Sequence, residues 1–231
     1  MHQRPLIIEN ISIDVERKNI RSIRIAVYPR TGRVRLAAPH WVSEETLQAY
    51  AISRLPWIKK HRKRLMCKEP RAAYEYVSGE HHFYNGHPYL LEVVSSDRSH
   101  GAALENSTIK LFTGKVTTRH QRSEILAEWY RSQMKAQLPA MIAAWEPRMG
   151  VQVKELGIKR MKTRWGSCNI RTQRIWLNLE LAKKSVQCLE YVLVHEMAHL
   201  LVPNHSMEFK TLMNTFLPNW KLLKQELSKN K

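Results

Sequence analysis

The residues best suited to chemistry lie in one short segment, YVLVHEMAHLLVPNHSMEF, at residues 191–209. His195 and His199 stand four residues apart, so an α-helix would place both imidazoles on one face, about one turn apart. Two histidine nitrogens so arranged can occupy two corners of a tetrahedral zinc site. Glu196 follows the first histidine and can reach water on the metal without being a ligand. The pattern therefore predicts a zinc-dependent hydrolase with Glu196 as general base.

A third ligand must come from beyond this helix, and His205 is the main candidate. Pro203 cannot continue the helical hydrogen-bond ladder and disfavours helical geometry at Val202, so the chain turns and can return His205 to the metal. Three histidines would leave one position open for water, as in catalytic zinc sites. Two carboxylates are alternatives: Glu208, for which a solvated charge on a helix face is the simpler interpretation, and the more distant Glu226.

The elements of the N-terminal half follow from apolar alternation and turn-forming pairs. In order, we expect a hairpin (20–29 and 33–38), a helix (43–65) that Pro56 kinks or splits, a linker (67–73), a hairpin across Asn85-Gly86, a polar loop (95–107) and a strand (107–112). The helix is predicted from Ser43, a good N-cap, and from the acidic residues that follow it in the first turn. The histidines that flank the second hairpin turn are interpreted as surface residues: His81, His82 and His87.

The C-terminal half is predicted to be mainly helical with a small sheet. Its expected elements are a helix (121–145) that Pro139 bends, strands near 152–160 and 172–178, a helix from Ser185 to a break at Pro203, and helices at 206–216 and 219–228. We find no internal sequence repeat. The composite is an α+β fold with two parts: a β-rich N-terminal region with a basic helix at 1–118, and a zinc-binding catalytic domain at 119–231.

The charge balance is strongly basic, because 38 Lys and Arg stand against 20 Asp and Glu, for a formal net charge of +18 in 231 residues. Such an excess attracts polyanions. Basic residues crowd at 59–64 and 159–164, beside Trp57 and Trp165, which suits base stacking. A solvated basic face with core tryptophans is the simpler interpretation of each run. We nevertheless expect non-specific nucleic-acid binding through the basic surface.

Other features exclude several classes of protein. The chain has no run of 18 apolar residues, so we expect no membrane-spanning helix. Its N-terminal segment lacks the long apolar region and cleavage site of a secretory signal, which predicts the cytoplasm. The three cysteines are odd in number and widely spaced, so neither a disulfide scaffold nor a C-x-x-C metal knuckle is expected.

Motifs along most of the chain resemble one known family. They are RSIRIAVYPRTGRVRLAAP (21–39), YNGHPYLLEV (84–93), TRWGSC (163–168), WLNLELA (176–182) and HEMAHLLVPNHSMEF (195–209). Together they resemble the YgjP-like metallopeptidase family, which is related to the SprT-like and WLM zinc proteases. The resemblance implies zinc held by His195, His199 and His205, with Glu196 catalytic. It also implies a gluzincin-like core with a small sheet packed over the active-site helix.

The histidine spacing also matches the metzincin proteases, but those carry a glycine where this chain has Val202. Valine resists the left-handed turn that glycine permits, so we reject that assignment.

Three functions remain as hypotheses. A peptidase would direct the activated water at an amide carbonyl. A nucleoside triphosphate phosphohydrolase or pyrophosphatase would direct it at phosphorus, with Arg160, Lys162 and Arg164 on the phosphates. A nucleic-acid-binding module would use zinc only to hold its fold. The resemblance places the peptidase first, so the expected substrate is a peptide or protein, with a nucleotide as the alternative. Arg164 and Asn178 are the candidate substrate-binding residues.

Overall fold

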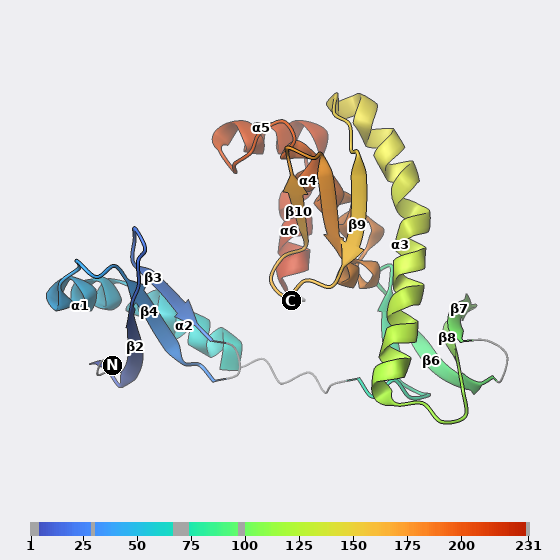
Figure 1. Ribbon diagram of the computed structural model, residues 1–231, viewed down its shortest axis with the longest axis horizontal. Coiled ribbons are helices and arrows are strands. Elements are labelled where there is room, and N and C mark those ends of the chain that lie inside the picture. The colour runs from blue at the N-terminus through green and yellow to red at the C-terminus, as the bar shows by residue number, and fades with distance from the viewer. Residues whose placement is uncertain (1–4, 29–30, 67–73, 97–99, 230–231) are drawn as a thin grey trace. The chain divides into compact units, whose positions relative to one another are not determined.

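The computed structural model describes residues 5–28, 31–66, 74–96 and 100–229. The chain divides into two compact units, Met1–Ala73 and Tyr74–Lys231 (Figure 1). The described residues form six α-helices, one 3₁₀ helix and three small sheets, which confirms the predicted α+β class. The linker predicted at 67–73 lies outside the described residues. The division precedes the boundary predicted near residue 118, because the second sheet packs on elements of the C-terminal half.

The first unit is a four-stranded sheet with two helices. Its elements are β1 (Leu6–Ile8), β2 (Ile11–Arg17), β3 (Arg24–Val27), β4 (Val34–Ala38), α1 (Glu44–Ser53) and α2 (Leu55–Met66). The strand order is β1-β2-β4-β3, with β2 and β4 parallel. Alternate strand residues such as Ile13 and Leu36 are buried in one cluster with Leu47 and Ile58 of the helices, so both helices cover the same face of the sheet.

The predicted break near Pro56 is confirmed. Ser43 caps α1 and accepts a hydrogen bond from the Thr46 amide, as its N-cap prediction requires. The first helix ends at its C-cap, Arg54, and α2 begins at Leu55. Proline is tolerated in the first turn of a helix because the missing amide proton has no helical partner there. Pro56 therefore starts a new helix instead of bending the old one.

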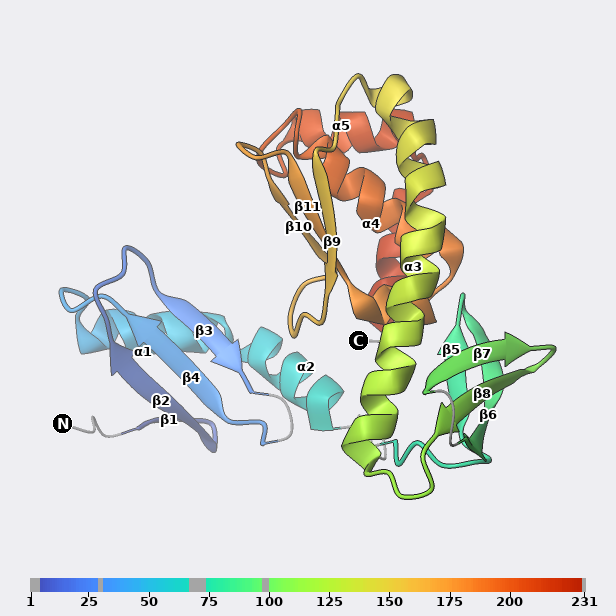
Figure 2. The same ribbon diagram turned by 45° about the vertical axis from the view of Figure 1, so that its right-hand side comes forward.

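The second unit begins with another four-stranded sheet, visible in Figure 2. Its strands are β5 (His81–Tyr84), β6 (His87–Ser95), β7 (Gly101–Glu105) and β8 (Thr108–Thr113), in the order β5-β6-β8-β7. The hairpin predicted across Asn85-Gly86 is confirmed. The loop predicted at 95–107 is wrong in part, because Gly101–Glu105 forms a strand despite its small residues and lack of alternation. The surface assignment is also wrong for His82, which is buried on the inner face of β5.

A long helix and a three-stranded sheet follow. The elements are α3 (Arg119–Met149), β9 (Glu155–Lys159), β10 (Gly166–Asn169), β11 (Arg174–Asn178) and the 3₁₀ helix η1 (Leu179–Lys183), with the strand order β10-β11-β9. Thr118 and Gln121 form a capping box at the start of α3, and Gly150 closes it in a left-handed conformation. The helix is longer than the predicted 121–145, and it continues through both of its internal prolines.

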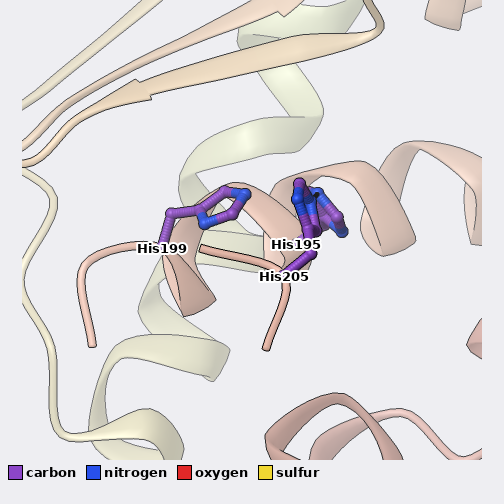
Figure 3. Close-up of side chains that lie close together, drawn as sticks. All are labelled: His195, His199 and His205. Atoms are coloured by element: carbon purple, nitrogen blue, oxygen red, sulfur yellow. Dashed lines mark hydrogen bonds between the residues drawn. The ribbon is translucent and has the colours of Figure 1, made fainter. Parts of the chain in front are cut away.

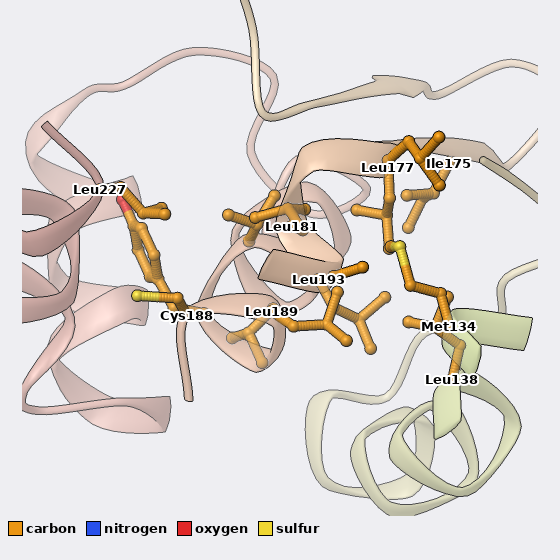
Figure 4. Close-up of a cluster of buried hydrophobic side chains, with 14 of the residues drawn as sticks. Met134, Leu138, Ile175, Leu177, Leu181, Cys188, Leu189, Leu193 and Leu227 are labelled. Atoms are coloured by element: carbon orange, nitrogen blue, oxygen red, sulfur yellow. The ribbon is translucent and has the colours of Figure 1, made fainter. Parts of the chain in front are cut away.

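Three helices complete the unit: α4 (Val186–Ala198), α5 (Met207–Phe216) and α6 (Trp220–Lys229). The helix α4 contacts α3, α5, α6, β10, β11 and η1, so it lies at the centre of the unit. Its apolar side chains join those of α3 and β11 in a continuous core, shown in Figure 4 by Met134, Leu138, Ile175, Leu177, Leu189 and Leu193. None of the described helices combines the length and apolarity needed to span a membrane.

Candidate metal centre

The helix α4 places the first two histidines. Ser185 caps it by accepting from the Cys188 amide, and the apolar residues that follow are buried on most sides. His195 lies in the last turn, and His199 is the C-cap. The amide of Val202 still donates to the carbonyl of Ala198, so the chain makes one more turn before it leaves the helix. The chain then folds back, so that the segment after Val202 lies near the end of α4.

His205 lies in that segment, just before Ser206, the N-cap of α5. Its Nε2 lies 3.0 Å from Nε2 of His195. One ligand nitrogen of each of the three histidines lies within 4.8 Å of the others. Figure 3 shows the three rings gathered at the end of α4. The expected return of the chain after Pro203 is therefore present in the structure.

The chemistry of these rings fits a divalent metal ion. Nδ1 of His199 lies 3.1 Å from the carbonyl oxygen of Val202. A carbonyl only accepts, so Nδ1 carries a proton, and in the neutral ring the lone pair then lies on Nε2, as in metal-binding histidines. Burial, together with the neighbouring His199 and His205, lowers the pKa of His195 to about 3. All three rings pack around Phe209, with ring centroids 4.6 to 5.0 Å away. Packing around Phe209 thus holds the three rings in place.

The two carboxylates considered as alternatives to His205 do not join the group. Glu208 is exposed in the first turn of α5, where the helix dipole favours it. Glu226 of α6 accepts a hydrogen bond from the Ser185 hydroxyl, 3.0 Å away. The structure therefore brings His205, and neither of these residues, to the pair on α4.

Glu196 is buried, with 6% of its surface exposed, and lines the same pocket as the histidines. Burial raises its pKa to about 7, and Arg164 opposes this shift. The strand β10 runs against this side chain. A Cβ added to Gly166 would lie 2.7 Å from both Cγ and Oε1 of Glu196, so the glycine allows the close approach. The TRWGSC segment thus forms one wall of the site.

The pocket has a volume of about 690 Å³. Arg164 lines it, as its candidate role requires. Asn178 is placed differently, because its side chain is buried beneath the segment that precedes β10. Its amide nitrogen donates to the carbonyls of Met161 and Arg164, at 2.9 and 2.7 Å, and its oxygen accepts from the amides of Met161 and Glu180. Asn178 therefore holds Arg164 in position and does not face the pocket.

The sequence did not reveal the contribution of α6. Lys224 and Leu227 of this helix line the pocket, and the charge of Lys224 helps to lower the pKa of both His195 and His205. Cys168 of β10 also lines it, as a free thiol whose pKa burial raises to about 11. No motif connects these positions to the histidines, since they meet only through the packing of α6 and β10 on α4.

Comparisons with known proteins include two solved structures. Among solved structures, the chain is similar to the metallopeptidase zymogen abylysin of Pyrococcus abyssi, at 18% identity and a TM-score of 0.38, over 41% of this chain and 94% of that one. The metallopeptidase zymogen jannalysin of Methanocaldococcus jannaschii gives 16% identity and a TM-score of 0.37, over 41% and 96%.

Among curated proteins, none matches the chain. The family model of the YgjP-like metallopeptidase domain matches residues 21–230, which is nearly the whole sequence. The chain therefore belongs to the YgjP-like metallopeptidase family.

Proposed function

We propose that the protein is a zinc-dependent metallopeptidase, with His195, His199 and His205 as zinc ligands and Glu196 as general base. The carrying observation is the convergence of three histidine nitrogens within 4.8 Å in the pocket that holds a buried glutamate. Family membership implies a metal ion, and three imidazoles with one open position suit catalytic zinc. The described cysteines are free thiols, which supports the cytoplasm as its proposed location.

The histidines and Glu196 have different roles at the site: metal binding and proton transfer. Zinc bound by the histidines would supply a Lewis acid that acidifies water and polarises the scissile carbonyl. Glu196 accepts the proton of the attacking water at its carboxylate and returns a proton to the leaving amine. A pKa of about 7 suits both steps near neutral pH, because a general base works best when its pKa lies near the operating pH.

Two cations line the pocket from opposite elements, Arg164 before β10 and Lys224 on α6. Glu196 is the one carboxylate among the described pocket residues. We assign Arg164 and Lys224 to the binding of a substrate carboxylate or carbonyl oxygen, since charge-assisted hydrogen bonds are the stronger ones. Asn178 acts as a positioning residue for Arg164 through its bond to the Arg164 carbonyl.

The replacement Glu196→Gln tests the general base. Glutamine keeps the size and hydrogen bonding of the side chain but cannot take a proton, so peptide hydrolysis should fall by about 10² to 10⁴ while the zinc content stays unchanged. Glu208→Gln is the matched control. It makes the same chemical change at the exposed carboxylate near the site and should alter neither turnover nor metal content. Hydrolysis of unfolded proteins and short peptides is measured for both variants beside the wild type.

The ligand set has its own test. His205→Ala should weaken zinc binding by more than the roughly 10- to 100-fold cost of losing a hydrogen-bond partner of a ligand. Elemental analysis of protein purified without added metal measures the effect. Full zinc affinity in this variant would remove His205 from the site. Nucleoside triphosphates are included as substrates, and their turnover in the wild type alone would replace the peptidase proposal by the phosphohydrolase.

A further inference from the structure

The positive charge of the chain is unevenly divided between its two units. Sixteen of the 38 Lys and Arg, but only six of the 20 Asp and Glu, lie in residues 1–73. The first unit thus carries a formal net charge of +10 in 73 residues, whereas the much larger second unit carries +8. Like charges at this density repel one another within a small fold. An anionic partner bound to the first unit would relieve this repulsion.

The helix α2 carries much of this charge on one face. Leu55 and Ile58 are buried against the sheet, whereas Trp57, Lys60 and Lys63 are exposed. The helical period of 3.6 residues places these three exposed positions together, opposite the buried ones. The outer surface of α2, formed by Trp57, Lys60 and Lys63, is therefore a basic face that includes an aromatic ring.

The carboxylates that the structure describes in the first unit do not neutralise this face. Three of them form ion pairs with other cations, listed here by pair: Glu9 with Lys59, Asp14 with Arg33, and Glu16 with Lys18 and Arg35. Glu44 and Glu45 lie in the first turn of α1. Within the described part of the chain, no carboxylate pairs with Lys60 or Lys63. Their ammonium groups are free to contact an anionic partner.

Trp57 supplies a second kind of contact. The residue is 38% exposed, and its ring stacks on that of His61, with the centroids 4.0 Å apart and the planes at 24°. A tryptophan ring fixed beside lysines is the combination with which proteins hold unpaired bases and their phosphates. We propose that the outer surface of α2 binds single-stranded nucleic acid, with Lys60 and Lys63 on phosphates and Trp57 against a base.

An anionic membrane is the main alternative partner, and the structure disfavours it. A helix that lies in a membrane interface needs an apolar face directed outward. Leu55 and Ile58, the aliphatic residues of α2 whose burial is described, are instead buried in the first unit. Trp57 is the one large apolar side chain among the exposed residues described on this helix.

The lysine contacts are tested with the full chain and labelled single-stranded oligonucleotides, titrated from about 50 to 200 mM salt. Each phosphate contact on a single strand contributes about 0.7 to the slope of log affinity against log salt. Lys60→Gln with Lys63→Gln should therefore lower the slope by about 1.4 and weaken binding roughly tenfold at low salt. Lys135→Gln with Lys154→Gln, two exposed lysines of the second unit, is the matched control. It removes the same charge and should change neither quantity.

The aromatic contact is tested with Trp57→Leu, which keeps an apolar side chain on the helix. Affinity for single strands should fall roughly 5- to 150-fold with an unchanged salt slope, and affinity for duplexes should stay constant. Thermal unfolding of each variant confirms that the fold is kept. No binding at low salt, or an equal loss in the control pair, would overturn the proposal. So would phosphatidylserine vesicles that bind through Lys60 and Lys63 when oligonucleotides do not. Single-strand binding that is indifferent to Trp57→Leu would overturn the assignment to unpaired bases.

Discussion

The two four-stranded sheets share one topology. Their strand orders, β1-β2-β4-β3 and β5-β6-β8-β7, correspond strand by strand. In each sheet the two central strands are parallel: β2 with β4, and β6 with β8. Both sheets begin with a hairpin whose two turn residues have positive φ, Glu9-Asn10 in the first and Asn85-Gly86 in the second. No internal repeat is evident in the sequence, so the repetition exists at the level of the fold alone.

The sheets differ in what the first turn contacts. In the first unit, Glu9 forms an ion pair with Lys59 of α2. In the second, the Asn85 amide donates to the carbonyl of Ala182 in η1, and Gly86 lies against the backbone of Ser185, the N-cap of α4. The first sheet closes on its own helices, whereas the second supports the start of the helix that carries the histidines. One topology thus forms a separate module in one place and a scaffold for the metal centre in the other.

The largest expected difference between the units is their response to metal. A ligand that binds only the folded state stabilises it by RT ln(1 + [L]/Kd), which is about 4 kcal/mol at 1,000 times Kd. Zinc should therefore stabilise the second unit by about this amount and leave the first unchanged. Hydrogen exchange of the full chain, resolved by peptide with and without chelator, reports each unit separately. His199→Ala is the control that should not respond, and equal protection of both units by zinc would contradict the separation.

A smaller effect is expected at the turn that supports α4. Gly86 has φ of 85°, and an added Cβ would lie 3.2 Å from the N and Cα atoms of Ser185. The left-handed conformation costs an L-residue about 1 to 2 kcal/mol, and crowding against a helix cap adds to this. Gly86→Ala should destabilise the second unit by about 3 kcal/mol, measured by denaturant unfolding.

Gly79 provides the matched control for that substitution. Its φ is 95°, but an added Cβ would meet nothing within 4 Å. Gly79→Ala therefore incurs the conformational cost without the crowding and should destabilise the unit by roughly 1 to 2 kcal/mol. If both substitutions cost the same, the contact with Ser185 contributes nothing, and the second sheet is no more a scaffold than the first.

Acid should also distinguish the units. Burial lowers the pKa of His82, which is 2% exposed, although its hydrogen bond to Glu80 opposes the shift. In the unfolded chain this histidine has a pKa near 6.5. Below that pH the unfolded chain therefore binds more protons than the folded chain, and the free energy of unfolding falls as the pH falls. The slope contributed by one histidine is at most about 1.4 kcal/mol per pH unit. No histidine among the described residues of the first unit is buried.

The variant His82→Phe isolates this contribution. Phenylalanine keeps a ring beside Tyr74, whose centroid lies 4.3 Å from that of His82, but it cannot titrate. In metal-free protein, the stability of the variant between about pH 6.5 and 5 should fall less steeply than that of the wild type. Parallel slopes would show that His82 takes up its proton as readily in the folded chain as in the unfolded one.

The grouping of the three histidines could be predicted from the sequence because it depends on local structure. The spacing of His195 and His199 fixes their relative position on any helix, and Pro203 forces the chain to turn before His205. The structure brings these three histidines together in one pocket with Glu196. Lys224 lies outside every local pattern, because only the packing of α6 on α4 brings it to the pocket.

The fold was harder to predict where one sheet depends on distant pairing. The alternation of apolar residues revealed β3, β4, β5 and β6, but β7 has the sequence GAALE and is defined by its pairing with β8. The burial of His82 also follows from tertiary packing, since Tyr74 and Tyr76 cover its ring. The hairpin of β1 and β2 was not predicted, because Glu9-Asn10 lacks the glycine that usually marks such turns.

That missing glycine leads to the smallest expected effect. Asn10 and Gly86 occupy the same position in their two turns, at φ of 63° and 85°. Glycine is the preferred residue there, and its relief of the left-handed strain outweighs the entropy it adds to the unfolded chain by a few tenths of a kcal/mol. Asn10→Gly should therefore stabilise the first unit by about 0.5 kcal/mol, while the reciprocal Gly86→Asn destabilises the second through its contact with Ser185. Denaturant midpoints that shift by equal amounts in opposite directions would show that the two turns are equivalent and that the contact with Ser185 adds nothing.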